Sequence, residues 1–407
     1  MNEIERYLAA AAGVETVAAG QDLTVKVDLV MAHDVTAPLA LAPYREIGVD
    51  KVFDPAKVLF VIDHVYPAPS VQARHSHREM RAFAREFGFP ILEGEGVCHQ
   101  VISERYPLAR GAIVVGADSH TCTAGAYGAL AFGVGSTEAA AAMATGTLDI
   151  EVPEVQAVFL EGKLSPGVSA KDVILFLIGQ FGGGGLTDQA ILFAGGWVRQ
   201  STKDERMTIS NMTIEMGAML SYFSELTDAD AIGPVARVHH FDVGQIPALM
   251  AAPSFPANVK PISELAGKPV SQVVIGSCTN GRISDMRDAA AVFKNASVDA
   301  DVNCVIIPAS RQVVAQMEEE GLTRIFRQAG ATVTSPGCGS CYGGHMGLAT
   351  ADDVVVSTTN RNFAGRMGAK TAQIYLASAR SAAEAAVAGK IVAPGTVAPL
   401  EGVSAHA

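Results

Sequence analysis

Residues 272–280 read QVVIGSCTN, an apolar run that stops at a glycine and continues as a short polar turn carrying a cysteine. The same arrangement recurs where residues 58–62 precede Asp63 and His64, where residues 112–115 precede GADSH, and where residues 354–356 precede STTNR. Short continuous apolar runs that alternate with helical stretches are typical of buried parallel strands in an α/β fold. Because ligands bind beyond the carboxyl ends of such strands, we expect these polar turns to carry the chemistry.

Three stretches predict helices between the strands. Residues 136–145 are rich in alanine and begin at Ser136 as the expected cap, residues 283–295 follow the cysteine turn, and residues 377–388 end before Gly389. Glycine and proline at residues 162–167, and the prolines between residues 253 and 261, are candidate linkers. We therefore expect three α/β domains, at residues 1–160, 161–262 and 263–407.

Composition narrows the class of protein. The 407 residues allow about two to three domains, each able to bury its own core. An apolar share of 49% with 18% charged residues excludes a disordered chain and a coiled coil. The net charge of −12 argues against a general nucleic-acid-binding surface, which needs an excess of Lys and Arg.

The sequence also bears on localisation. The N-terminus lacks the charge order of a secretory signal. No apolar stretch reaches the roughly 18 residues that a membrane span needs. We therefore expect a soluble cytoplasmic protein with no membrane partner.

Six cysteines are too few for a disulfide-built scaffold of this length and suit a reducing compartment. Cys338 and Cys341 form a C-x2-C pair in the segment PGCGSCYGG, and Cys278 occupies a comparable glycine-flanked turn. A structural zinc site needs four protein ligands. The spacing alone leaves open a three-cysteine iron–sulfur cluster, a redox dithiol and a structural metal site. The other cysteines are expected to be packing residues: Cys98, Cys122 and Cys304.

Three thiolates on a four-iron cluster would have a definite chemical result, since one iron would keep an open position. An open iron is a Lewis acid that can bind a hydroxyl and a carboxylate without transferring an electron. It would make an alcohol oxygen a good leaving group, which the dehydration of a hydroxy acid requires.

Four segments carry a resemblance to a known family: residues 116–121, residues 276–280, the Cys338/Cys341 segment and residues 360–366. Together they resemble the aconitase superfamily. From about residue 23 to residue 389, the order and spacing resemble the branch of 3-isopropylmalate dehydratase and homoaconitase large subunits. The resemblance implies a three-domain core with mainly parallel sheets around one 4Fe-4S cluster per chain. Cys278, Cys338 and Cys341 would hold this cluster, and one iron would have no protein ligand.

The resemblance also implies roles for polar residues. Asp63-His64 resembles the family's Asp–His pair, in which His64 would handle the proton of the hydroxyl group and Asp63 would orient it. Further catalytic positions are matched by His99, Asp118, His120 and Glu215. Substrate-binding positions are matched by His33, Ser119 and Asn211. Taken without the family, Asn211 and Glu215 are a polar pair on one predicted helix.

Arg361 and Arg366 complete the predicted substrate site. An ideal helix would place residues five apart at about 140° from one another, whereas a loop can aim both inward. Guanidinium groups match the carboxylates of a di- or tricarboxylic acid. We therefore expect a small polycarboxylic acid as substrate.

Single-chain members of the superfamily have a further swivelling domain, whose Gly-Ser-Ser-Arg turn supplies the base that acts at carbon. That turn does not occur in this sequence. We expect a separate small subunit to supply the swivel domain and its base. The substrates that fit this branch are isopropylmalate, as in leucine biosynthesis, homocitrate, 2,3-dimethylmalate and maleate or citraconate, with isopropylmalate favoured.

Two hypotheses from other classes remain. A cluster-dependent RNA-binding regulator is disfavoured by the acidic net charge and the retained acid–base residues. A zinc-stabilised structural protein would contain zinc in place of iron.

Overall fold

The computed structural model of the protein describes residues 1–228 and 231–398. Contacts within the chain divide it into two compact units. The first comprises Met1–Glu93, Val101–Lys163 and Gly184–Val243, and the second comprises Gly94–Gln100, Leu164–Gly183 and the chain from Gly244 onward.

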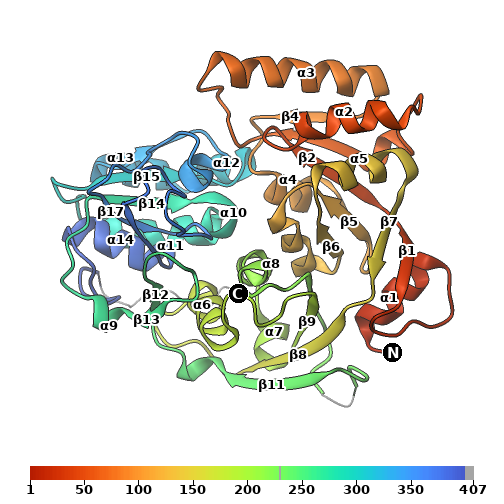
Figure 1. The fold of residues 1–407 in the computed structure, drawn as a ribbon. Helices are drawn as coiled ribbons and strands as arrows, with labels where there is room; N and C mark the ends of the chain where they lie inside the picture. The colour runs from red at the N-terminus through yellow and green to blue at the C-terminus, as the bar shows by residue number, and fades with distance from the viewer. Residues whose placement is uncertain (229–230, 399–407) are drawn as a thin grey trace. The chain divides into compact units, whose positions relative to one another are not determined.

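The first unit contains two parallel sheets and an antiparallel strand pair (Figure 1). The five-stranded sheet has the order β4-β3-β2-β5-β6, with every neighbouring pair parallel. Its strands are β2 (Leu29–His33), β3 (Val58–Ile62), β4 (Ile91–Glu93), β5 (Ile113–Gly116) and β6 (Leu130–Gly133). The four-stranded sheet has the order β10-β9-β8-β11 and comprises β8 (Glu154–Glu161), β9 (Gln189–Ala194), β10 (Leu220–Phe223) and β11 (Arg237–Asp242). The antiparallel pair is β1 (Asp22–Lys26) with β7 (Thr147–Glu151).

Helices cover the five-stranded sheet, because its central strands are apolar on both faces. Every residue of β2, β3 and β5 is buried. Helices α3 and α5 contact the strands, and α2 packs against both of these helices. The helices of this unit are α1 (Glu3–Ala12), α2 (Ala37–Ile47), α3 (Val71–Phe87), α5 (Ser136–Thr145), α7 (Gly196–Gln200), α8 (Lys203–Asn211) and the 3-10 helices η1 (Pro55–Lys57), η2 (Ser119–Tyr127) and η3 (Thr213–Met216).

The second unit is built on a seven-stranded sheet of order β13-β12-β18-β17-β14-β15-β16. The strands from β18 to β16 are parallel, whereas β12 runs antiparallel to both of its neighbours. The strands are β12 (Leu249–Ala251), β13 (Val259–Pro261), β14 (Gln272–Gly276), β15 (Asn303–Ile307), β16 (Thr332–Val333), β17 (Val354–Ser357) and β18 (Gln373–Leu376). The helices are α6 (Ala170–Phe181), α9 (Ile262–Leu265), α10 (Ser277–Asn280), α11 (Ile283–Phe293), α12 (Arg311–Glu319), α13 (Leu322–Ala329), α14 (Ala379–Ala388) and η5 (Gly339–Tyr342). Two short elements contain a boundary between the units: α4 (Cys98–Arg105) and η4 (Val243–Gln245).

The predicted mainly parallel α/β fold is confirmed, and all four predicted strands end within one residue of the expected place. The caps differ in detail. Gly135, not Ser136, precedes α5, because the Glu138 carboxylate accepts a hydrogen bond from the Gly135 amide while the Ser136 hydroxyl donates to the Thr36 carbonyl. Helix α14 begins two residues late because Ser378 caps it. The division at residues 1–160, 161–262 and 263–407 stays a prediction.

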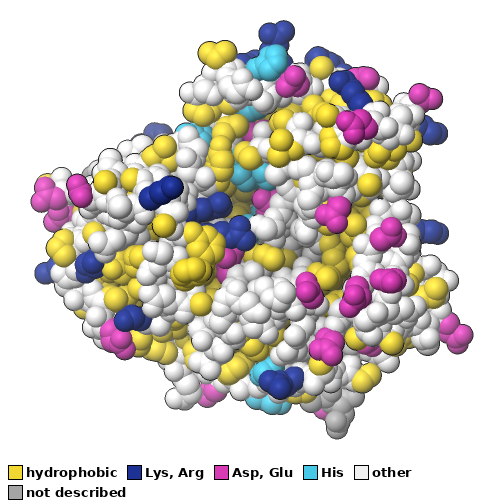
Figure 2. Space-filling view, viewed as in Figure 1, with side chains coloured by type: hydrophobic (Ala, Val, Ile, Leu, Met, Phe, Trp, Pro, Cys, Tyr) yellow, Lys and Arg dark blue, Asp and Glu magenta, His cyan; other side chains and the backbone are white. Residues whose placement is uncertain are grey.

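Two further expectations from the sequence concern a nucleic-acid-binding surface and membrane-spanning segments. On the face drawn in Figure 2, Lys and Arg side chains are interspersed with Asp and Glu. Among residues 1–228 and 231–398, none of the helices combines the length and the apolar character needed to cross a bilayer.

Candidate active site

Parallel pairing brings polar residues together at one edge of the five-stranded sheet. β2 lies between β3 and β5, so the residues after these strands share the carboxyl edge. His33 ends β2, Asp63 and His64 follow β3, and Asp118 follows β5. The imidazole rings of His33 and His64 stack with their centroids 3.7 Å apart. These polar residues therefore lie close together at the carboxyl edge of the sheet.

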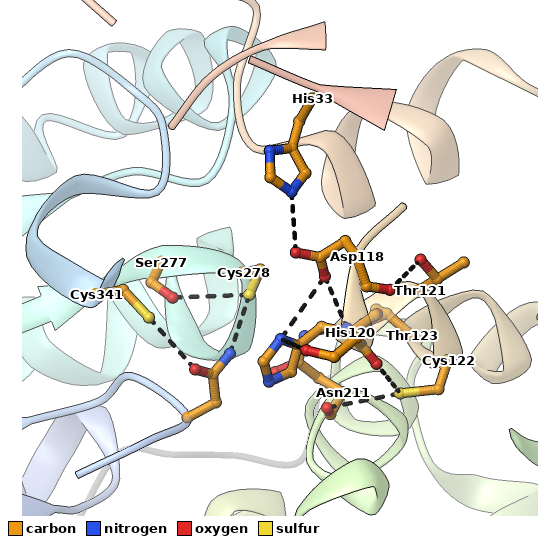
Figure 3. Close-up of polar contacts among 12 residues, drawn as sticks. His33, Asp118, His120, Thr121, Cys122, Thr123, Asn211, Ser277, Cys278 and Cys341 are labelled. Carbon is orange, nitrogen blue, oxygen red and sulfur yellow. Dashed lines mark hydrogen bonds and ion pairs between the residues drawn. The ribbon is translucent and has the colours of Figure 1, made fainter. Parts of the chain in front are cut away.

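Four buried histidines in this unit each face their own carboxylate. His64 Nδ1 lies 2.8 Å from Asp63 Oδ1. His33 Nε2 lies 3.1 Å from Asp118 Oδ2, the contact drawn in Figure 3. The two further pairs are His120 Nε2 with Glu215 Oε1 at 3.2 Å and His77 Nε2 with Asp34 Oδ2 at 3.1 Å. A carboxylate fixes the orientation of the ring that it accepts a hydrogen bond from and stabilises its protonated form. Such a set can hold and move protons.

His64 is the histidine whose protonation is most clearly perturbed. Burial lowers its pKa, but the charge and the hydrogen bond of Asp63, with the charges of Asp118 and Asp34, outweigh burial and raise the pKa to about 9. The ring is therefore protonated at neutral pH. Nδ1 is hydrogen-bonded to Asp63, and the protonated ring carries its second N–H at Nε2.

Asp34, which sequence reasoning did not assign, holds the Asp63–His64 turn in place. Its carboxylate accepts hydrogen bonds from the backbone amides of residues 63, 64 and 65 at 3.3, 2.9 and 3.0 Å, in addition to the bond from His77. Burial raises the pKa of Asp34, but the His77 hydrogen bond, the His64 charge and the backbone bonds hold the pKa well below its usual value. The carboxylate therefore stabilises the fold at neutral pH, and this contribution is lost only as the pH falls through that lowered pKa.

The cluster of His33, Asp34, Asp63 and His64 has ligand atoms within 4.8 Å of one another, the spacing of a mononuclear metal site. The hydrogen bonds described above join each of these residues to a neighbouring protein group. The four side chains are therefore held in place as a hydrogen-bonded network.

Glu215 and Asn211 belong to different elements, which corrects the expectation of one continuous helix. Helix α8 ends at Asn211, and Glu215 lies in the 3-10 helix η3. The buried Asn211 amide donates to the Thr123 hydroxyl at 2.8 Å, and Ser119 Oγ lies 3.4 Å from His120 Nδ1. Both residues therefore position η2, the segment that carries His120.

The second unit presents the cysteines on tight turns. Gly276 ends β14 with φ +150°, and a Cβ there would lie 2.0 Å from the Ile307 carbonyl oxygen, so only glycine fits. Ser277 follows with φ 75°, a left-handed conformation that is uncommon for serine. This abrupt turn places Cys278 directly beyond the strand end. Cys338 directly precedes η5 and Cys341 lies within it, and a Cβ on Gly339 between them would lie 2.3 Å from Ile307 Cδ1.

The amide of Asn360 stands between two of the thiols. Its Nδ2 donates to Cys278 Sγ at 3.3 Å, and its Oδ1 accepts from Cys341 Sγ at 3.3 Å (Figure 3). Cys278, Cys338 and Cys341 are 4%, 3% and 1% exposed, so these thiols are sheltered from solvent. Within the described residues, the buried hydroxyl of Ser340 has no hydrogen-bond partner.

These features fit a polynuclear cluster better than a single zinc ion. A zinc ion needs its ligand atoms about 2.3 Å from one centre, whereas here an amide separates two thiols. Sheltered thiols, neighbouring amide and hydroxyl groups and glycine-lined turns suit an iron–sulfur cluster, whose sulfur atoms accept hydrogen bonds.

Arg361 and Arg366 lie on a loop between β17 and β18, as predicted. Asn362 anchors this loop, because its amide donates to the carbonyls of Ala252 at 2.9 Å and Ile374 at 3.2 Å. Gly343 packs so tightly on the loop that a Cβ there would lie 2.8 Å from the Arg366 carbonyl oxygen. The arginine loop and the cysteine segment are thus in contact within one unit.

His99 and the three cysteines that were expected to be packing residues are all buried. His99, on α4, is buried and belongs to the second unit. Cys98, Cys122 and Cys304 are buried, and burial raises the pKa of the Cys122 and Cys304 thiols to about 12, as suits packing residues. Sequence reasoning assigned no functional role to five further residues: Asp34, His77, Lys171, Arg282 and Asn360. One signal for His77 was available, since it shares a face of α3 with the buried Met80 and Ala84.

The sequence matches the profile of the aconitase family (aconitate hydratase) over residues 7–230 and 244–389. The chain belongs to this family. It is 44% identical to the probable 3-isopropylmalate dehydratase large subunit of Methanothermobacter thermautotrophicus, over 98% of this chain and 99% of that protein. It is 41% identical to the 3-isopropylmalate dehydratase large subunit of Aquifex aeolicus, over 98% of both chains.

A solved structure shares the fold of this family member. Holo aconitase X of Thermococcus kodakaraensis superposes with a TM-score of 0.52 and 12% identity, over 89% of this chain and 93% of the other. At this identity the likeness establishes the fold alone. It agrees with the predicted aconitase-like architecture.

We predict that His77→Ala lowers the free energy of unfolding by about 2 kcal/mol, because it removes a donor from a buried carboxylate. The control is His75→Ala on the same helix, where the side chain is 63% exposed and a change within about 0.5 kcal/mol is expected. Denaturant melts of the two variants at pH 7 compare them. Equal losses in the free energy of unfolding for the two variants would show that the His77–Asp34 hydrogen bond does not stabilise the fold.

Proposed function

We propose that this chain is the large subunit of a 4Fe-4S hydro-lyase, with 3-isopropylmalate as the substrate. The observation that carries the proposal is the 40–44% identity, over nearly the full length, to proteins named 3-isopropylmalate dehydratase large subunits. The histidine–carboxylate pairs and the sheltered thiols described above are the groups that this chemistry uses. The reaction removes water from a 2-hydroxy acid and adds it back at the neighbouring carbon.

Cys278, Cys338 and Cys341 would hold the cluster. When bound, a cluster with three thiolate ligands supplies a Lewis acid at its remaining iron. Asn360 orients two of these thiols through its amide, and the Ser340 hydroxyl offers a further hydrogen bond to the site.

His64 supplies the proton for the departing hydroxyl group in this proposal. Its Nε2–H is the acid, and Asp63 keeps the ring charged and oriented. His120 with Glu215 and His33 with Asp118 form second and third pairs that can accept hydrogen bonds from, or donate them to, the substrate oxygens, as can Ser119 and His99. Arg361 and Arg366 bind the carboxylates through guanidinium hydrogen bonds.

A partner subunit completes the proposed enzyme. The relatives are named large subunits, which implies a small subunit beside them. We propose that the small subunit supplies the base that removes the proton from carbon. The chain and its partner would act in the cytoplasm on a small polycarboxylic acid.

The first test measures the cluster. Anaerobic reconstitution should give iron, sulfide and visible absorbance in the natural chain, whereas Cys338→Ser should lose all three. Cys304→Ser is the matched control, because Cys304 is buried in β15 within the hydrophobic core, and its cluster content should be unchanged. A cluster that survives Cys338→Ser but not Cys304→Ser would refute the ligand assignment.

The second test measures turnover by the reconstituted chain with and without its small subunit. We expect turnover of 2- and 3-isopropylmalate by the two-subunit enzyme and little by the large subunit alone. Homocitrate, 2,3-dimethylmalate and maleate or citraconate form the comparison panel. Full-rate hydration by the isolated large subunit would refute the partner's role, and preference for another acid would reassign the substrate.

The third test follows the pH dependence of dehydration. Because the raised pKa of His64 keeps the ring protonated up to about pH 9, kcat/KM should fall as the pH rises through that value. Asp63→Asn removes the largest stabilising charge, so the alkaline limb should move to lower pH by about one unit or more. The exposed Asp22→Asn serves as the control and should leave the profile in place. An unmoved limb in Asp63→Asn would exclude His64 as the acid.

A further inference from the structure

A buried lysine lies behind the strand ends of the second unit. Lys171, near the start of α6, is fully buried, and its Nζ donates to Asn280 Oδ1 at 3.2 Å. The same nitrogen donates to the carbonyl oxygens of Thr358 and Thr359, each at 2.7 Å. All three N–H bonds of the ammonium group are therefore used. Thr358 and Thr359 directly precede Asn360 in the sequence, and Asn280 lies two residues after Cys278.

A buried arginine, Arg282, donates hydrogen bonds to the backbone of the same turn. Arg282, 1% exposed, donates through its guanidinium group to the Cys278 carbonyl at 2.5 Å and to the Thr279 carbonyl at 2.6 Å. Its Nε donates to the Gln100 side chain at 3.1 Å. These bonds tie the Arg282 side chain to the backbone of the Cys278 turn and to Gln100.

Two buried carboxylates, Asp285 and Asp172, lie near Lys171. Asp285 accepts hydrogen bonds from the Asn280 amide at 2.8 Å and from the Arg282 backbone amide at 3.0 Å. Asp172, also fully buried, accepts from the Leu249 and Ser169 backbone amides, each at 2.8 Å. Burial lowers the pKa of Lys171 to about 7, while the charges of Asp285, Cys341 and Cys278 favour its protonated form. The three hydrogen-bond acceptors of Lys171 Nζ are neutral, so the cost of burying this ammonium group falls when an anionic group occupies the thiols.

We infer that Lys171 and Arg282 are positioning residues that hold the Cys278 turn, and that Lys171 supplies positive charge against which an anionic iron–sulfur cluster is bound. The inference rests on the proposed function. A cluster ligated by three thiolates is anionic, and its reduction potential depends on nearby charge and on hydrogen bonding. Positive charge held by the protein favours the reduced cluster and disfavours loss of iron from it.

The test compares Lys171→Met and Lys171→Gln with Lys294→Met in the full chain after anaerobic reconstitution. Lys294, at the exposed end of α11, is the control for the same change in net charge. The readouts are the midpoint potential of the cluster, the rate at which its visible absorbance bleaches in air, and the thermal stability of the iron-free chain. Lys171→Gln retains a hydrogen-bond donor without the charge, which separates charge from local packing.

Both Lys171 variants should have a lower midpoint potential than the natural chain. Lys171→Met should also bleach about tenfold faster, the effect of losing one charge-assisted hydrogen bond. Lys294→Met should match the natural chain. Potentials and bleaching rates equal to those of the control would overturn the inference, as would failure of both Lys171 variants to fold without iron, since the lysine would then serve the fold alone. Failure of the natural chain to take up iron and sulfide would refute the proposed function instead.

Discussion

The parallel pairing of β2 between β3 and β5 is the constraint on which the histidine cluster depends. Parallel neighbours end at the same edge, so three segments that are far apart in the chain place their first polar residues together. The register aligns His33 with Val61, one residue before the end of β3. A shift of one residue would turn these side chains to the opposite face. The buried, uninterrupted apolar strands therefore fix the geometry of the polar groups that follow them.

The strand ends were predictable because their signal is local. An apolar run followed by glycine and polar residues specifies a buried strand and its end within a few residues of sequence. The Cys278 turn illustrates this, since Gly276 is required by a backbone approach that any side chain would block. The arginine loop was predictable for a similar reason, because Gly365 between Arg361 and Arg366 disfavours a helix.

The residues that hold the site were not predictable, because their partners lie far away in sequence. Lys171 bonds to residues between 109 and 188 positions away, and at the start of a helix it is indistinguishable from an ordinary polar first-turn residue. Asp34 accepts from residues 29 to 43 positions away, so its role exists only once β2, β3 and α3 have packed. The break between Asn211 and Glu215 is likewise tertiary, since Asn211 bonds to Thr123 on another element. Periodicity can identify a buried polar residue, but only the packed structure identifies its partner.

The two units compensate their buried charged groups in different ways. In the first unit each buried histidine has its own carboxylate, so the polar groups of the network are held by one another. In the second unit Lys171 is held by carbonyl and amide oxygens, which satisfy its hydrogen bonds but leave its charge. A ligand that supplies the opposite charge binds the folded chain and not the unfolded one, so it adds directly to stability. On this argument the histidine network is rigid before anything binds, whereas the cysteine turns reach their full stability only with an anionic group in place.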